Sequence, residues 1–165
     1  GFAISQNGRV LRFALKAHEE ISTKNGRRYA RLAKGDGIFL VTATEGEENV
    51  AVASAGGRAM LFPLSETPVL KAAGRGVTGI KLREDDELVA CQLVRGSLAG
   101  PAVQTSFGRD LVIRERKFGI GKRGGRGKVV LKRGTIDLWH RSPTVRTGSD
   151  KDAPPAIVDD VEDLD

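Results

Sequence analysis

The residues best suited to chemistry in this sequence are cations interleaved with glycine. Residues 122–128 read Lys-Arg-Gly-Gly-Arg-Gly-Lys, so four of the seven are basic and three are glycine. Arginine and lysine form charge-assisted hydrogen bonds with phosphate, and adjacent glycines let backbone N–H groups approach the same anion. This composition predicts a phosphate-binding loop.

Further basic clusters lie near residues 24–31, 71–81 and 132–133. Contact with a sugar–phosphate backbone requires many cations along one surface and no reading of the bases. The sequence therefore predicts nonspecific contacts with nucleic-acid phosphates. The candidate contact residues are Lys24, Arg27, Arg28, Arg31, Lys71, Arg75, Lys81, Lys122, Arg123, Gly124, Gly125, Arg126, Gly127, Lys128, Lys132 and Arg133.

Other patterns are weak evidence for catalysis. Residues 119–124 match G-x-G-x-x-G, but a basic, strand-like stretch follows them, whereas dinucleotide binding requires a helix there. Tyr29 is the only tyrosine, and we interpret it as a packing residue at a turn. Residues 85–87 are acidic, and we interpret them as a charged turn and not as a metal site. No catalytic residue, metal site or cofactor site is predicted in this chain.

Charge is divided unevenly along the chain. The 165 residues carry a net charge of +6. Residues 150–165 contain seven acidic residues and one lysine, so they carry −6, and residues 1–149 carry the remaining +12. We expect residues 150–165 to form an acidic disordered tail. Such a tail is either a solvated end or a polyanion that competes with nucleic acid for the basic body.

The composition is typical of a folded protein built from short strands. Hydrophobic residues make up 39% of the chain, and glycine makes up 21 residues of 165. The apolar runs are too short to span a membrane. The first nine residues show no signal-peptide pattern, and the chain does not begin with methionine, so it could be a fragment.

Two Gly-Arg landmarks recur three times along the chain. The first landmark occurs at intervals of 49 and 51 residues, and the second follows it after 18, 17 and 17 residues. The glycines of the first landmark are Gly8, Gly57 and Gly108, and those of the second are Gly26, Gly74 and Gly125. This spacing predicts three structural repeats, with units of about 1–49, 50–100 and 101–149.

Each unit has the pattern of a small antiparallel sheet. Strands are expected before each first landmark, at residues 3–5, 50–53 and 103–106, where they form hairpins. Alternating strands are expected at 77–82 and 128–132, and apolar strands at 38–42, 88–94 and 136–139. Residues 14–20 are expected to form one helical turn. A period near fifty residues with about four strands per unit predicts an all-β array of three stacked blades.

Residues 57–66 and 74–82 resemble the blade sequence of a known family. The family is the C-terminal domain of the A subunit of bacterial type IIA topoisomerases, DNA gyrase and topoisomerase IV. The resemblance extends over residues 2–140. It implies a β-pinwheel, a propeller-like array whose strands exchange between neighbouring blades, here open or truncated. It also implies a noncatalytic domain that binds double-stranded DNA and wraps or bends it.

Residues 122–127 are similar to the gyrase box of that family, Gln-Arg-Arg-Gly-Gly-Lys-Gly. Gly121 and Lys122 stand where the family has Gln and Arg, and the motif lies in the third unit instead of the first. Both gyrase and topoisomerase IV therefore remain open as the parent enzyme. The resemblance implies two partners, the remainder of the A subunit together with the B subunit, and a location in the bacterial cytoplasm with the nucleoid. It further implies that ATP and magnesium serve the parent enzyme, and that an acidic tail modulates wrapping.

The cost of bending DNA sets how many contacts are needed. A globule of this length has a radius of gyration of about 15 Å, which places a bound duplex axis at a radius of about 30 Å. Bending the duplex there through about 90° costs on the order of 8 kcal/mol. A few isolated surface charges would not offset that cost, whereas eight to ten phosphate contacts would. Two alternative functions stay open, a propeller-like protein-interaction module and an RNA-binding β-module.

Overall fold

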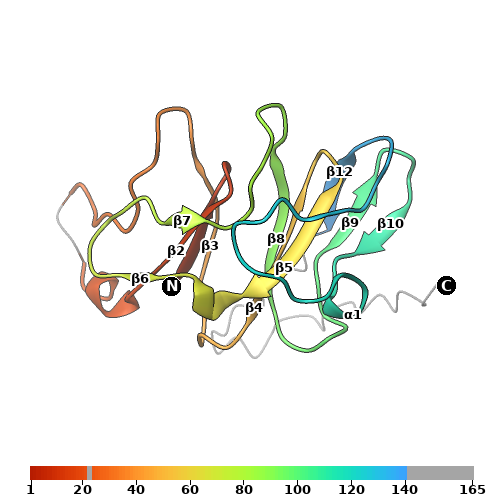
Figure 1. The fold of residues 1–165 in the computed structure, drawn as a ribbon. Helices are drawn as coiled ribbons and strands as arrows, with labels where there is room; N and C mark the ends of the chain where they lie inside the picture. Colours follow the sequence, from red (N-terminus) through yellow and green to blue (C-terminus); the bar gives the residue numbers. More distant parts are fainter. Residues whose placement is uncertain (22–23, 141–165) are drawn as a thin grey trace, which may run out of the picture.

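The computed structural model describes residues 1–21 and 24–140. The predicted acidic tail at 150–165 lies outside the described residues. The described chain forms three sheets side by side, which confirms the all-β prediction (Figure 1). No helix in the described part of the chain is long and apolar enough to cross a membrane.

Each sheet is built around an antiparallel hairpin. The hairpins join β1 (Phe2–Ser5) to β2 (Arg9–Phe13), β4 (Asn49–Ser54) to β5 (Arg58–Pro63), and β9 (Ala102–Thr105) to β10 (Asp110–Val112). The glycines that end the three turns have φ angles of 76°, 79° and 72°, which favour glycine. The predicted hairpins at the first landmark are therefore present in all three units.

A third strand of each unit pairs with the other side of the hairpin. These strands are β3 (Ile38–Thr42), β8 (Leu88–Val94) and β12 (Ile136–His140). The apolar runs predicted these strands well, since each strand has side chains that pack in or against the core clusters. Three short helical segments complete the fold: η1 (Leu15–His18), η2 (Leu64–Glu66) and α1 (Glu115–Phe118). The first was expected, and the other two were not.

Strands pass from each unit into the sheet of the preceding unit. β6 (Val69–Leu70) and β7 (Val77–Thr78) of the second unit pair with β2, and β11 (Lys128–Val129) of the third unit pairs with β5. The sheets consequently contain five, four and three strands, where about four in each were expected. The exchange makes the first two sheets depend on the next unit for outer strands, whereas the third sheet contains strands of its own unit alone.

The exchanged strands are shorter than the predicted strands at 77–82 and 128–132. β7 and β11 have two residues each. The N–H groups of Gly79 and Ile80 both donate to the Gly8 carbonyl, and those of Val130 and Leu131 both donate to the Gly57 carbonyl. The chain bends around these two carbonyls, so the ladder cannot continue.

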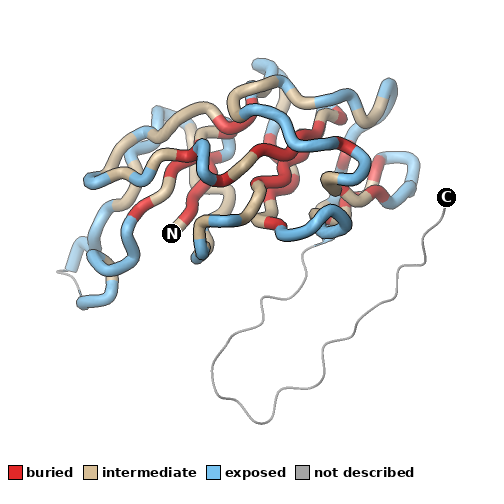
Figure 2. The backbone as a smooth tube through the Cα atoms, turned by 60° about the horizontal axis from the view of Figure 1, so that its bottom comes forward, coloured by how far each residue is buried: buried red, intermediate tan, exposed pale blue. Residues whose placement is uncertain are grey.

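The core is divided into clusters that the exchange helps to build. Phe2, Val50, Phe62 and Ile80 are buried in one cluster, so the exchanged segment of the second unit supplies a core side chain to the first sheet. Figure 2 shows the buried residues concentrated along the central strands, with exposed residues in the loops. Cys91 lies in the same cluster, and its burial raises the pKa of its thiol well above the usual range.

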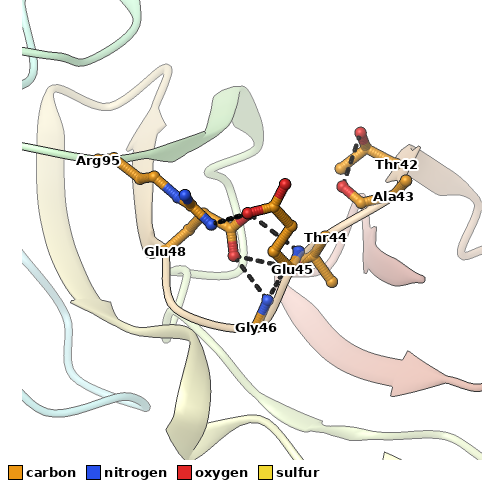
Figure 3. A network of polar contacts seen from close by, with 7 residues as sticks. All are labelled: Thr42, Ala43, Thr44, Glu45, Gly46, Glu48 and Arg95. Atoms are coloured by element: carbon orange, nitrogen blue, oxygen red, sulfur yellow. Dashed lines mark hydrogen bonds and ion pairs between the residues drawn. The ribbon is translucent and has the colours of Figure 1, made fainter.

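The loop between β3 and β4 is closed by the carboxylate of Glu48 (Figure 3). Glu48 accepts hydrogen bonds from the Thr44 hydroxyl at 2.6 Å and from the N–H groups of Glu45 and Gly46 at 3.1 and 3.0 Å. Arg95 follows β8 and pairs with Glu45 at 2.6 Å. Burial raises the pKa of Glu48, but the hydrogen bonds from Thr44 and the backbone outweigh it and lower that pKa to about 2. The loop is thus held by an ionised carboxylate.

Replacing Glu48 with Gln should destabilise the fold and weaken its acid sensitivity. The folded-state pKa of about 2 lies below the ordinary value of 4.5, so the carboxylate stabilises fully above pH 4.5. That stability is lost as the pH falls through about 2. We expect a loss of about 1–2 kcal/mol near neutral pH by urea unfolding, and a smaller loss in acid. The exposed neighbour Glu47, changed to Gln, is the matched control. Equal losses for both variants would contradict this account.

Candidate nucleic-acid interface

Three basic segments lie in a row across the units. We call residues 26–31, 74–81 and 122–128 the basic loops. The Arg31 N–H donates to the Gly74 carbonyl at 2.9 Å, which joins the first loop to the second. The Gly124 N–H donates to the Gly79 carbonyl at 2.7 Å, and the Lys81 N–H donates to the Gly125 carbonyl at 2.8 Å. These two bonds join the second loop to the third. The middle loop, which contains β7, therefore contacts both of the others (Figure 1).

Arginines from different units converge where the first two basic loops meet. Arg9, Arg31 and Arg75 line a shallow hollow together with Ala30 and Asp36. The Asp36 carboxylate accepts hydrogen bonds from nearby backbone N–H groups at 3.1 and 2.9 Å, so it shapes the turn beside the hollow. Charge that is distant in sequence is thus concentrated on one surface.

Most of the candidate cations are exposed. Twelve of the thirteen predicted basic residues are exposed, and only Arg123 is half-buried. The exposed ones are Lys24, Arg27, Arg28, Arg31, Lys71, Arg75, Lys81, Lys122, Arg126, Lys128, Lys132 and Arg133. Lys128 also donates through Nζ to the Phe118 carbonyl at 2.6 Å. The other exposed candidates lie in the basic loops or beside them, where their positive charges are accessible to a polyanion.

Two of the candidate glycines have a structural reason to be glycine. Gly127 has a φ of 74°, and a Cβ there would lie 2.8 Å from the Ala59 carbonyl oxygen. Gly76, which was not among the candidates, occupies the equivalent place against Val10 in the preceding sheet. Gly124 has a φ of 82°, and its N–H is already bonded to the Gly79 carbonyl. These positions let the basic loops lie directly against neighbouring strands.

Arg9 and Arg58 hold the basic loops, a role that the sequence pattern did not reveal. Arg9 donates to the carbonyls of Arg75 and Gly76 at 3.0 and 2.7 Å. Arg58 donates to the Gly127 carbonyl at 3.1 Å. The recurrence of arginine after the turn glycine is the sequence signal for this role, although by itself it indicates only the hairpin landmark.

Comparison with known proteins places this geometry among related domains. The family model described as DNA gyrase C-terminal domain, beta-propeller, matches residues 2–45 and 48–95. The DNA gyrase A protein of Aminobacterium colombiense is 30% identical over 130 residues, which cover 79% of this chain and 16% of that protein. The chain thus spans about a sixth of the length of such relatives.

Two solved structures share the fold. A crystal structure of the C-terminal domain of DNA topoisomerase IV aligns with a TM-score of 0.74 and 24% identity, and covers 86% of this chain and 46% of that one. A DNA gyrase A C-terminal domain aligns with a TM-score of 0.64 and 22% identity, and covers 82% of this chain and 46% of that one.

Proposed function

The chain belongs to the family of DNA gyrase C-terminal domains with the beta-propeller fold, and we propose that it binds duplex DNA nonspecifically and bends it. The exposed cations of the basic loops contact phosphates of both strands as the duplex passes from unit to unit. Arginine and lysine at these positions bind the phosphates irrespective of the base sequence. The domain itself performs no bond-breaking step.

One observation supports this proposal above all. The basic loops of three units, far apart in sequence, are joined by backbone hydrogen bonds between Arg31 and Gly74 and between Lys81 and Gly125. A stiff duplex needs cations that follow one another along a surface, because each contact must offset part of the elastic cost. Isolated surface charges would not provide such a path.

The proposal extends to the larger enzyme. We propose that this domain works beside the remainder of a topoisomerase A subunit, together with the B subunit, in the bacterial cytoplasm. ATP and magnesium would serve catalytic parts of that enzyme, while this chain would need no cofactor to bind DNA. The acidic residues at 150–165 would compete with DNA for the basic loops.

A competition assay tests the proposal against the two alternatives. Labelled duplex bound to the chain is challenged with linear duplex, relaxed circular DNA and single-stranded RNA at one fixed salt concentration. We expect both DNA forms to displace the label at similar concentrations and RNA to displace it more weakly. Stronger displacement by RNA would support an RNA-binding module. A protein partner whose binding is insensitive to salt and nuclease would support an interaction module.

A further inference from the structure

Arg123 differs from the other candidate cations because its side chain bonds to the preceding unit, whereas the inward bond of Lys128 stays within the third unit. Its Nε donates to the Glu66 carbonyl at 3.0 Å, and its Nη1 donates to the Thr78 carbonyl at 2.6 Å. Its own N–H donates to the Glu66 carboxylate at 2.7 Å. One residue of the third unit is therefore attached to two separate segments of the second unit.

The neighbours of Arg123 reinforce this attachment. The bonds from the Gly124 N–H to the Gly79 carbonyl and from the Lys81 N–H to the Gly125 carbonyl hold the third basic loop against the second just after Arg123. Lys122 and Arg126 flank the attachment and are exposed. Neither forms a side-chain hydrogen bond or ion pair within the described part of the chain. The loop thus contains two cations bonded to backbone carbonyls, Arg123 and Lys128, and two that face solvent, Lys122 and Arg126.

The same turn of the second unit is held from the other side by the first unit. The Nε of Arg12 donates to the Thr67 carbonyl at 2.7 Å, and its N–H donates to the Pro68 carbonyl at 2.9 Å. Consecutive carbonyls at Glu66 and Thr67 therefore accept arginines from the two flanking units. This turn, at the end of η2, joins all three units.

We propose that Arg123 is a positioning residue that fixes the third basic loop relative to the second and thereby sets how far bound DNA bends. This inference rests on the proposed function. A bent duplex exerts an elastic restoring force on the surface that binds it. The loops must therefore be rigid relative to one another. Arginine suits this role because its planar guanidinium donates to the two carbonyls from two different nitrogens in a fixed geometry, which the single Nζ of lysine does not reproduce.

The test separates bending from phosphate contact. The bend is measured by energy transfer between dyes at the ends of a duplex of about 40 bp, and contacts are counted from the salt dependence of affinity. We expect Arg123→Ala to keep the salt slope of the wild-type chain but to lose about half of the gain in energy transfer. Arg123→Lys should behave like Arg123→Ala. Arg126→Ala is the matched control and should make the salt slope shallower by about 1.

A second variant distinguishes the proposed effect on bending from a general loss of stability. Arg12→Ala removes the equivalent attachment at the other junction, outside the basic loops, and should also reduce the bend without changing the slope. All variants are compared well below their unfolding temperatures, with circular dichroism as the check. The inference is wrong if Arg123→Ala makes the salt slope shallower as Arg126→Ala does. It is also wrong if DNA bound to Arg123→Ala bends as much as DNA bound to the wild type. If the wild-type chain itself fails to bend DNA, the proposed function fails first.

Discussion

Raising the salt concentration from about 50 mM to about 200 mM should lower the affinity of this chain for duplex DNA by about 10⁴- to 10⁵-fold. Each phosphate neutralised by a protein cation releases condensed counterions, so added salt opposes binding. Twelve predicted cations are exposed, which permits eight to ten simultaneous phosphate contacts. The measurement is the dissociation constant at several salt concentrations, with an expected log–log slope of about −7 to −9.

Paired variants show which cations produce that slope. Changing Arg75 and Arg126 together to Ala should make the slope shallower by about 2, because two phosphate contacts are removed. Arg95→Ala is the control, since Arg95 is already paired with Glu45 and should leave the slope unchanged. A wild-type slope shallower than about −3 would mean too few contacts to offset the bending energy. The wrapping function would then be untenable.

Gly76→Ala should destabilise the fold by at least about 3 kcal/mol, measured by urea unfolding. Gly76 has a φ of 66°, and a Cβ there would overlap the Val10 carbonyl oxygen in the adjacent strand. The added methyl group therefore strains the backbone and pushes the exchanged strand away from β2. A loss of this size is a large part of the total stability of a small domain.

Gly96→Ala is the control for backbone strain alone. Gly96 has a φ of 80°, but nothing lies within 4 Å of the position of its Cβ. We expect this variant to cost only about 1 kcal/mol. The difference between the two variants isolates the steric contribution of strand exchange. Equal losses would show that the contact between Gly76 and Val10 does not carry the stability assigned to it.

The strands of this fold were largely predictable because their signals are local. The apolar runs gave the bounds of β3 and β8 without error, since both strands are continuous apolar stretches whose side chains pack in or against the core clusters. The turn glycines predicted the three hairpins for the same reason. The extent of β7 and β11 was wrong, because two carbonyls of the preceding unit end these strands, and no local pattern records such distant acceptors.

The partners of the exchanged strands could not be read from the repeat itself. A period near fifty residues is the same whether Val77 pairs within its own unit or with Val10 of the preceding one. Only the family resemblance implied exchange. Repetition predicts that the basic loops are equivalent, and the structure shows that they are neighbours.

The candidate site shows the same division between local and distant causes. The exposure of Arg75 and Arg126 follows from the charge and glycine content of their own segments, which can be read from the local sequence. The inward bonds of Arg123 depend on carbonyls at Glu66 and Thr78, more than forty positions away along the chain. Arginines that bind phosphate and arginines that hold a loop have the same local sequence, so only the fold separates them.

The central claim is that adjacent basic loops curve a duplex along their surface. The most direct test is ligation of a linear duplex about as long as one persistence length, about 150 bp, with and without saturating protein. Such a fragment closes slowly on its own, because its ends seldom meet. A domain that bends DNA through about 90° should raise the rate of circle formation by at least about tenfold. An unchanged rate at full occupancy would show that the chain binds DNA without bending it.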